Sequence, residues 1–316
     1  MSVAWSRGLS RRIVPNARRF SRVHGQEQTT VPLAFTPLGH GTGSPLVVLH
    51  GLFGCKRNWK TLTKALHRSL PNTPIYTLDL RNHGSSPHAR PHTYQAMAVD
   101  VQSFITEKGL QNVSLIGHSM GAKVAMTVAL NLAKARKSDL LSRLVVVDMA
   151  PAKLLIDAKM RNYVPIMQNM NSMPAGMIKS LVDAERFLMA FEEDPVVRQF
   201  LLTNLVLPSH SRATAPHHDK AKFALPLDIL KPAIDALEEF PYDHTSDRGH
   251  PIWAGPTRVI AGRNSEYRVF EQEEALKAFF PNHDMHVLDT GHWVQAEKPN
   301  EFLKLVVDFL KPETGR

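Results

Sequence analysis

The chain has 316 residues, of which 43% are hydrophobic, and it carries a formal net charge of +9 at pH 7. This length suits one large α/β domain or a domain with a sizeable insertion. No run approaches the roughly 18 apolar residues that a membrane-spanning helix needs, so we expect no transmembrane segment. The single cysteine, Cys55, excludes an intrachain disulfide framework and a four-cysteine zinc site, and it fits a reducing compartment.

The positive charge is concentrated at the amino terminus. Residues 1–26 contain no Asp or Glu and hold six arginines, which are Arg7, Arg11, Arg12, Arg18, Arg19 and Arg22. An Arg-rich, Ser-containing and acid-poor leader is typical of a mitochondrial transit peptide. We therefore predict that residues 1–26 are a disordered transit peptide to the matrix, and that the charge does not indicate a nucleic-acid partner. A disordered basic arm is the other interpretation.

Six short apolar runs alternate with longer helical patterns, which indicates a mostly parallel, doubly wound α/β sheet. The predicted strands are residues 46–49, 75–78, 113–116, 144–147, 257–260 and 286–288. We place the core domain at residues 27–149 and 257–316.

Two of the helical patterns have clear limits. Apolar residues from Tyr94 to Ile105 share one helical stripe, with Thr93 as the N-cap and Gly109 just past the end. At the carboxyl terminus, residues 302–310 repeat the spacing of a helix that packs on a sheet.

Between residues 150 and 256 no strand-like run is found, and helical stretches alternate with prolines. Six methionines lie there, which are Met160, Met167, Met170, Met173, Met177 and Met189. We predict a helical cap inserted in the core, with flexible thioethers over an apolar acyl pocket. Equally, the methionines could fill irregular gaps between helices.

A nucleophile motif, Gly117-His118-Ser119-Met120-Gly121, lies between an apolar strand and a helix-compatible segment. A serine on such a sharp turn is held in a strained conformation that exposes its Oγ, and flanking glycines avoid collisions with neighbouring backbone. This context predicts that Ser119 is a catalytic nucleophile.

A serine needs a base, and His292 lies between the last predicted strand and the last helix. His118, His50 and His83 compete, but His118 is in the tight turn beside Ser119, and the other two precede the nucleophile in loops. We therefore assign the base to His292.

The acid is open between two residues. The loop after the strand at residues 257–260 holds Ser265 where an Asp would be expected, and Glu266 next to it is the alternative acid. Asp148 ends the neighbouring strand at residues 144–147, from which its carboxylate could reach the far nitrogen of His292. We favour Asp148.

An oxyanion hole needs two backbone N–H donors. The residue after the nucleophile, Met120, supplies one, and Leu52 in the glycine-rich run at residues 50–54 is expected to supply the other. Cys55 follows this run without an assigned base, and we treat it as a bystander. There is no HExxH motif, so we predict no metal site and no cofactor.

With these residues in place, the chain resembles the mitochondrial branch of the α/β-hydrolase superfamily that includes α/β-hydrolase domain-containing protein eleven, small bacterial esterases and the yeast ethanol acetyltransferases. The resemblance rests on residues 50–54, 79–86, 117–123, 147–151, 262–267 and 291–293. It implies an α/β-hydrolase fold with the cap after the sixth strand of the family's sheet, which here is the predicted strand at residues 144–147. It also implies an acid after that strand, which is Asp148 here.

Three functions follow as hypotheses. The first is a serine hydrolase that cleaves carboxylic esters or thioesters through an acyl-enzyme on Ser119. The second is an alcohol O-acetyltransferase that makes short esters such as ethyl acetate from acetyl-CoA. The third, of another class, is a hydrolase-fold protein that binds a matrix enzyme without chemistry. The expected partners are therefore a small acyl ester or acyl-CoA and, in the third case, a matrix protein.

Overall fold

The computed structural model describes residues 20–23, 26–208, 220–247 and 249–311. Most of the predicted leader, residues 1–19 and 24–25, lies outside these. The part that is described contributes a two-stranded antiparallel ribbon, in which β1 (Phe20–Val23) pairs with β2 (Gln26–Thr29).

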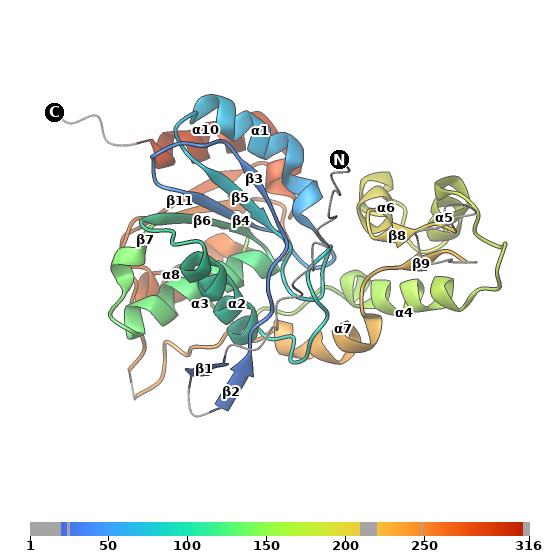
Figure 1. Cartoon of the computed structure of the whole chain (residues 1–316), viewed down its shortest axis with the longest axis horizontal. Helices are drawn as coiled ribbons and strands as arrows, with labels where there is room; N and C mark the ends of the chain where they lie inside the picture. The colour runs from blue at the N-terminus through green and yellow to red at the C-terminus, as the bar shows by residue number, and fades with distance from the viewer. Residues whose placement is uncertain (1–19, 24–25, 209–219, 248, 312–316) are drawn as a thin grey trace, which may run out of the picture.

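A seven-stranded sheet forms the centre of the molecule, with the order β11-β10-β7-β6-β4-β5-β3 (Figure 1). Its strands are β3 (Phe35–Leu38), β4 (Leu46–Leu49), β5 (Ile75–Leu78), β6 (Val113–His118), β7 (Leu141–Val147), β10 (Thr257–Gly262) and β11 (His283–Leu288). All neighbours are parallel except β3, which runs antiparallel to β5. The six predicted strands are all present.

The strand β3 was missed by the sequence analysis. It lies at the edge of the sheet, contains Pro37, and buries none of its four residues fully. An edge strand tolerates proline because one side of its backbone needs no partner, and it lacks the apolar run of a central strand.

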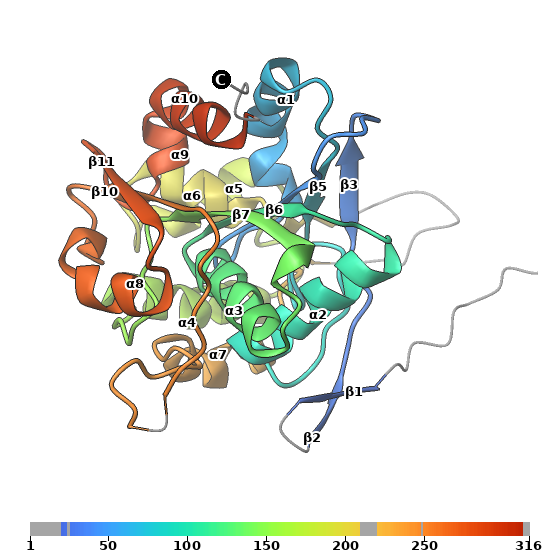
Figure 2. The ribbon, with the colours of Figure 1, turned by 90° about the vertical axis from the view of Figure 1, so that its left-hand side faces the viewer.

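Helices cover both faces of the sheet (Figure 2). One face carries α2 (Tyr94–Glu107), α3 (Met120–Lys134) and α8 (Glu273–Phe279). The other carries α1 (Lys60–Ser69), α9 (Val294–Glu297) and α10 (Pro299–Leu310). Short 3₁₀ turns occur at η1 (Lys56–Trp59), η2 (Ser138–Leu140) and η4 (Val269–Glu271).

The strands supply two apolar cores because successive side chains of a strand point to opposite faces. In β4, Val47 and Leu49 pack with α2 and α3, whereas Leu46 and Val48 pack with α1 and α10. All four side chains are fully buried, which explains why these strands read as continuous apolar runs.

The two helices with predicted limits are confirmed. The Thr93 hydroxyl accepts a hydrogen bond from the amide of Ala96 at the start of α2, and Gly109 follows its end with a φ of +62°. The carboxyl-terminal helix, α10, spans Pro299–Leu310.

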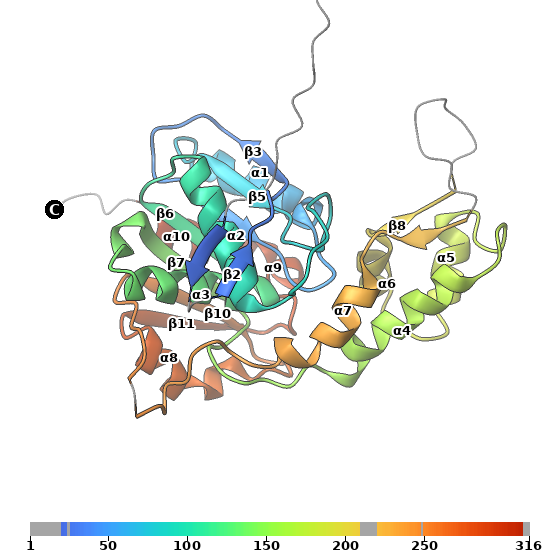
Figure 3. The ribbon, with the colours of Figure 1, turned by 60° about the horizontal axis from the view of Figure 1, so that its bottom comes forward.

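We use "cap segment" for residues 150–256, which join β7 to β10 and whose helices lie to one side of the sheet (Figure 3). It contains α4 (Ala158–Ser172), α5 (Leu181–Leu188), α6 (Pro195–Leu202), α7 (Leu227–Ala233) and η3 (Asp235–Leu237). It also contains a ribbon of β8 (Leu205–Val206) and β9 (Lys222–Phe223), which the sequence analysis did not foresee. Strands of two residues are too short to show a periodic pattern.

The predicted methionine lining is only partly seen. Met167 and Met170 are buried inside the cap segment, whereas Met177 and Met189 are exposed.

Within the described residues, no helix is both long and apolar enough to cross a membrane.

Candidate active site

Ser119 lies on the turn between β6 and α3, with a φ of +54° and a ψ of −120°. A non-glycine residue rarely adopts this left-handed φ, so the turn stores strain. A side chain on Gly117 would place its Cβ 2.1 Å from the carbonyl oxygen of Gly121, and one on Gly121 would lie 2.5 Å from that of His50. The two glycines are therefore required for the backbone to approach this closely.

His292 lies in the loop between β11 and α9, and its ring is oriented by Asp148. Nδ1 of His292 donates to Oδ2 of Asp148 over 2.7 Å. The carboxylate is fully buried, and the histidine side chain is 15% exposed. The Nδ1 contact leaves the Nε2 atom of His292 available for a proton from a serine hydroxyl.

Asp148 is held in place by its own backbone and by two further donors. Its φ is +47°, and its amide donates to the carbonyl of Ile260 in β10. Oδ1 accepts a hydrogen bond from the amide of Gly262 over 2.8 Å, and Oδ2 accepts one from the hydroxyl of Ser265. Ser265, which occupies the position where an Asp would be expected, thus donates a hydrogen bond to Asp148.

Glu266, the alternative acid, is exposed, and no contact joins it to His292 in the described part of the chain. The structure therefore brings Asp148 to the imidazole and leaves Glu266 at the surface.

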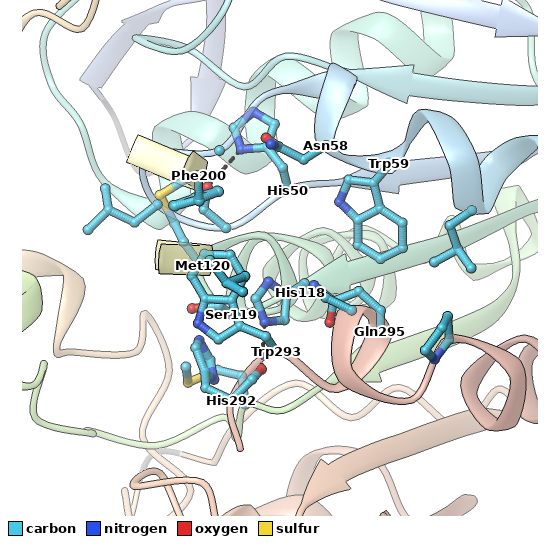
Figure 4. A pocket seen from close by; sticks show the side chains of 18 of the residues that line it. His50, Asn58, Trp59, His118, Ser119, Met120, Phe200, His292, Trp293 and Gln295 are labelled. Atoms are coloured by element: carbon cyan, nitrogen blue, oxygen red, sulfur yellow. Dashed lines mark hydrogen bonds between the residues drawn. The ribbon is translucent and has the colours of Figure 1, made fainter. Parts of the chain in front are cut away.

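Ser119 and His292 line one cavity of about 770 Å³ (Figure 4). Both predicted oxyanion donors, Leu52 and Met120, also line this cavity. Neither amide donates a hydrogen bond to another described group of the protein. Two backbone donors beside a serine at a helix amino terminus are suited to stabilise a developing oxyanion.

The loop that carries Leu52 is held by two histidines that had been considered as bases. His83 accepts at Nε2 from the amide of Phe53, and His50 accepts at Nε2 from the amide of Leu80. Both Nδ1 atoms donate to backbone carbonyls, those of Arg81 and Gly51. Burial lowers the pKa of each imidazole below its ordinary value, which keeps it neutral and able to accept.

The ring of His118, the residue before Ser119, is turned towards the backbone of His292. Its Nε2 donates to the backbone carbonyl of His292 over 2.9 Å, and the two rings lie 4.7 Å apart. Burial lowers the pKa of His118 to about 3, with a further contribution from His292. A neutral His118 thus holds the backbone of His292 in place through this hydrogen bond.

Lys123 is a residue of the site that the sequence analysis did not single out. It lies one turn into α3, is 1% exposed, and lines the cavity. Its ammonium donates to the carbonyls of Glu238 and Glu239 over 2.8 and 3.0 Å. Burial lowers the pKa of Lys123 to about 7, although the negative side chains of Glu239 and Glu238 raise it.

Apolar side chains from the cap segment form much of the remaining lining, among them Leu154, Ile156 and Met160. Phe200 of α6 packs edge-on against Trp293, with ring centroids 4.4 Å apart. The cap segment therefore contacts the chain next to His292. Among the described residues, no cluster of three or more His, Cys, Asp or Glu is arranged to hold a metal ion.

The sequence and the fold of the chain were compared with those of known proteins. The model of the α/β-hydrolase family matches residues 46–305. The chain is 33% identical to the sn-1-specific diacylglycerol lipase ABHD11 of Mus musculus, over 92% of this chain and 90% of that protein. It is 35% identical to a probable alcohol acetyltransferase of Saccharomyces cerevisiae, over 84% of this chain and 77% of that protein.

Among solved structures, a marine microorganism esterase superposes with a TM-score of 0.75 at 26% identity, covering 89% of this chain and all of that one. The sequence relatives include the two groups that the resemblance had indicated. The chain therefore belongs to the α/β-hydrolase family.

Proposed function

We propose that this protein is a serine hydrolase that cleaves carboxylic esters or thioesters through an acyl-enzyme on Ser119. The observation that carries the proposal is the buried Asp148 carboxylate on Nδ1 of His292, with Ser119 on the wall of the same cavity. The relatives named as a lipase and an acetyltransferase, and the esterase with the same fold, support acyl chemistry.

In the first half of the reaction, Nε2 of His292 takes the hydroxyl proton while Oγ of Ser119 attacks the substrate carbonyl carbon. The carbonyl oxygen becomes an oxyanion within reach of the Leu52 and Met120 amides. The bond from carbon to the leaving oxygen or sulfur then breaks, and His292 gives its proton to the leaving atom. The acyl group remains on Ser119.

In the second half, water attacks the acyl-enzyme, and His292 moves one proton from water to Oγ. If an alcohol replaces the water, the same steps yield a new ester. The similarity to an alcohol acetyltransferase supports a second candidate function, an alcohol O-acetyltransferase that uses acetyl-CoA. The two activities share one acyl-enzyme and differ only in the acceptor.

Supplying acetyl-CoA with ethanol tests the choice, because free acetate and ethyl acetate can be measured together. We expect acetate as the main product and none of either product from Ser119→Ala. A product that is mostly ethyl acetate would replace the hydrolase by the transferase. Normal cellular function of Ser119→Ala would favour the non-catalytic binding of a matrix enzyme.

We also propose that the protein acts in the mitochondrial matrix. The support is the leader composition, six arginines with no acidic residue in residues 1–26. Residues 1–26 fused to a fluorescent protein should direct it to mitochondria, and a cytosolic signal would contradict this address.

A further inference from the structure

One wall of the cavity at Ser119 lies where the cap segment joins the core. Leu154 and Ile156 belong to the chain that leaves β7, and Leu237 is the last residue of η3, on the chain that returns to β10. All three side chains line the cavity. We call these three residues the cap wall.

Glu238 ties the two chains of the cap wall together. Its carbonyl accepts a hydrogen bond from the amide of Leu154 over 2.9 Å, and its Oε1 atom accepts one from the amide of Ile156 over 3.0 Å. The same carboxylate pairs with the guanidinium of Arg161 in α4. The cap wall and α4 are therefore joined at one residue, which is 9% exposed.

The end of η3 is bound from the core by two side chains. The last carbonyls of a helix lack partners within it, and a cation beside them is favoured by the helix dipole. The Nζ atom of Lys123 donates to the carbonyls of Glu238 and Glu239 over 2.8 and 3.0 Å. A third carbonyl, that of Leu237, lies 3.5 Å from the same atom and also accepts from the hydroxyl of Tyr94 over 2.7 Å. Side chains of α2 and α3 thus both hold the cap wall at this point.

Lys123 relates the position of the cap wall to that of the nucleophile. It lies one helical turn after Ser119 in α3, the helix that begins at Met120. Its side chain is 1% exposed, and its three N–H donors are matched by three carbonyls, so none is left for a substrate. Because a helix is a rigid support, the position of this ammonium sets the distance between the acyl carbon on Ser119 and the cap wall.

The acyl chain is the part of the substrate that meets the cap wall. His292 must give its proton to the leaving atom, so the leaving group lies beside His292 and the chain that follows it. Gln295 and Ala296 of that chain line the cavity from α9, which packs on α10 (Figure 4). The apolar cap wall is then left for the acyl chain.

We propose that Lys123 is a positioning residue that holds the cap wall at a fixed distance from Ser119, and that the cap wall thereby selects acyl chains by their length. This inference rests on the proposed function, since it concerns the acyl group that Ser119 carries. An octanoyl chain extends along the apolar side chains of the cap wall, whereas an acetyl group ends at its first methyl. Without the ammonium, three carbonyls lose a donor, and the cap wall is no longer held against α3.

The test measures kcat/KM for p-nitrophenyl octanoate and p-nitrophenyl acetate, with the concentration of active enzyme set by fluorophosphonate titration. Lys123→Met removes the ammonium and keeps an unbranched side chain. The ratio of octanoate to acetate should fall by about 10-fold, which corresponds to the lost contact of roughly two methylene groups. The fall should appear mainly as a higher KM for the octanoate, because the wall contacts the chain in the substrate and the transition state alike. A general loss of folded enzyme would affect both esters equally.

Lys137→Met is the matched control, because Lys137 is an exposed lysine beyond the end of α3 and does not line the cavity. It should leave the ratio unchanged. A second series keeps the butyryl group and compares its octyl ester with its methyl ester. Lys123→Met should not change that ratio, since the alcohol lies beside α9. A change confined to the alcohol series would contradict the assignment of the cap wall to the acyl chain.

Tyr94→Phe replaces Lys123→Met in the test if the latter fails to fold and takes up no fluorophosphonate. It removes one donor from the same helix end, so the ratio of octanoate to acetate should fall about threefold, as expected for one neutral hydrogen bond.

An unchanged ratio in the variant that decides the test, or an equal fall in Lys137→Met, would overturn the inference. Ester hydrolysis that still depended on Ser119 would in that case leave the proposed function standing. A wild type that hydrolysed none of these esters would remove the proposed function and this inference together.

Discussion

At the scale of single residues, the acid lies outside the loop where an Asp would be expected, and it still contacts Nδ1 of His292. Asp148 follows β7, whereas the loop after β10 offers only Ser265 and Gly262 as donors to its carboxylate. Register makes the exchange possible, because Val147 of β7 lies opposite Ile260 of β10. The two strand ends are thus neighbours, and a carboxylate from either could approach His292.

Replacing Asp148 by asparagine should lower kcat by about 10⁴-fold, because an amide favours the wrong tautomer of the histidine. Steady-state kinetics on p-nitrophenyl butyrate measure this loss. Glu266→Gln is the matched control and should change kcat by less than about twofold, since Glu266 is exposed and away from the imidazole. The reverse ranking would move the acid to Glu266.

The sequence was sufficient to propose Ser119, His292 and Asp148, because each follows a recognisable strand. It did not indicate how the surrounding residues act. The contacts of His50 and His83 with amides about thirty positions away depend on tertiary packing, and no local pattern encodes them. The same holds for Lys123, which resembles any helical lysine in the sequence.

At the scale of elements, the predictions that the structure confirms concern helices and strands with a clear sequence pattern. The central parallel strands contain short apolar runs, and α2 has a Thr93 cap, so both could be recognised. The edge strand β3 and the ribbon of β8 and β9 could not, because their pairing is decided by neighbours and not by their own composition. The α3 helix connects core and cap segment through Lys123.

The connection through Lys123 should give stability a pH dependence. The pKa of Lys123 is about 7 in the folded protein, and a lysine in an unfolded chain has a pKa near 10.4. Between these values the unfolded state binds more protons, so the free energy of unfolding should rise with pH. This contribution is complete above the unfolded pKa and is lost as the pH falls through 7.

Urea unfolding at pH 7 and pH 9.5 measures this effect. The wild type should gain on the order of 2 kcal/mol relative to Lys123→Met over this range. Lys137→Met, which alters an exposed lysine, should behave as the wild type does. Equal pH dependence in the wild type and Lys123→Met would show that the buried ammonium does not titrate in this window.

At the scale of the whole molecule, three residues distant in sequence meet because their strands are parallel. β6, β7 and β11 all present their carboxyl ends at one edge of the sheet, and Ser119, Asp148 and His292 follow these ends. The cap segment and the pair of α1 and α10 then enclose a cavity around that edge.

The central claim is an acyl group held on Ser119, and mass spectrometry after reaction with a fluorophosphonate tests it most directly. We predict one adduct per chain, located on the peptide that contains Ser119, and no adduct on Ser119→Ala. Labelling of a different residue, or ester hydrolysis at the wild-type rate by Ser119→Ala, would contradict the account.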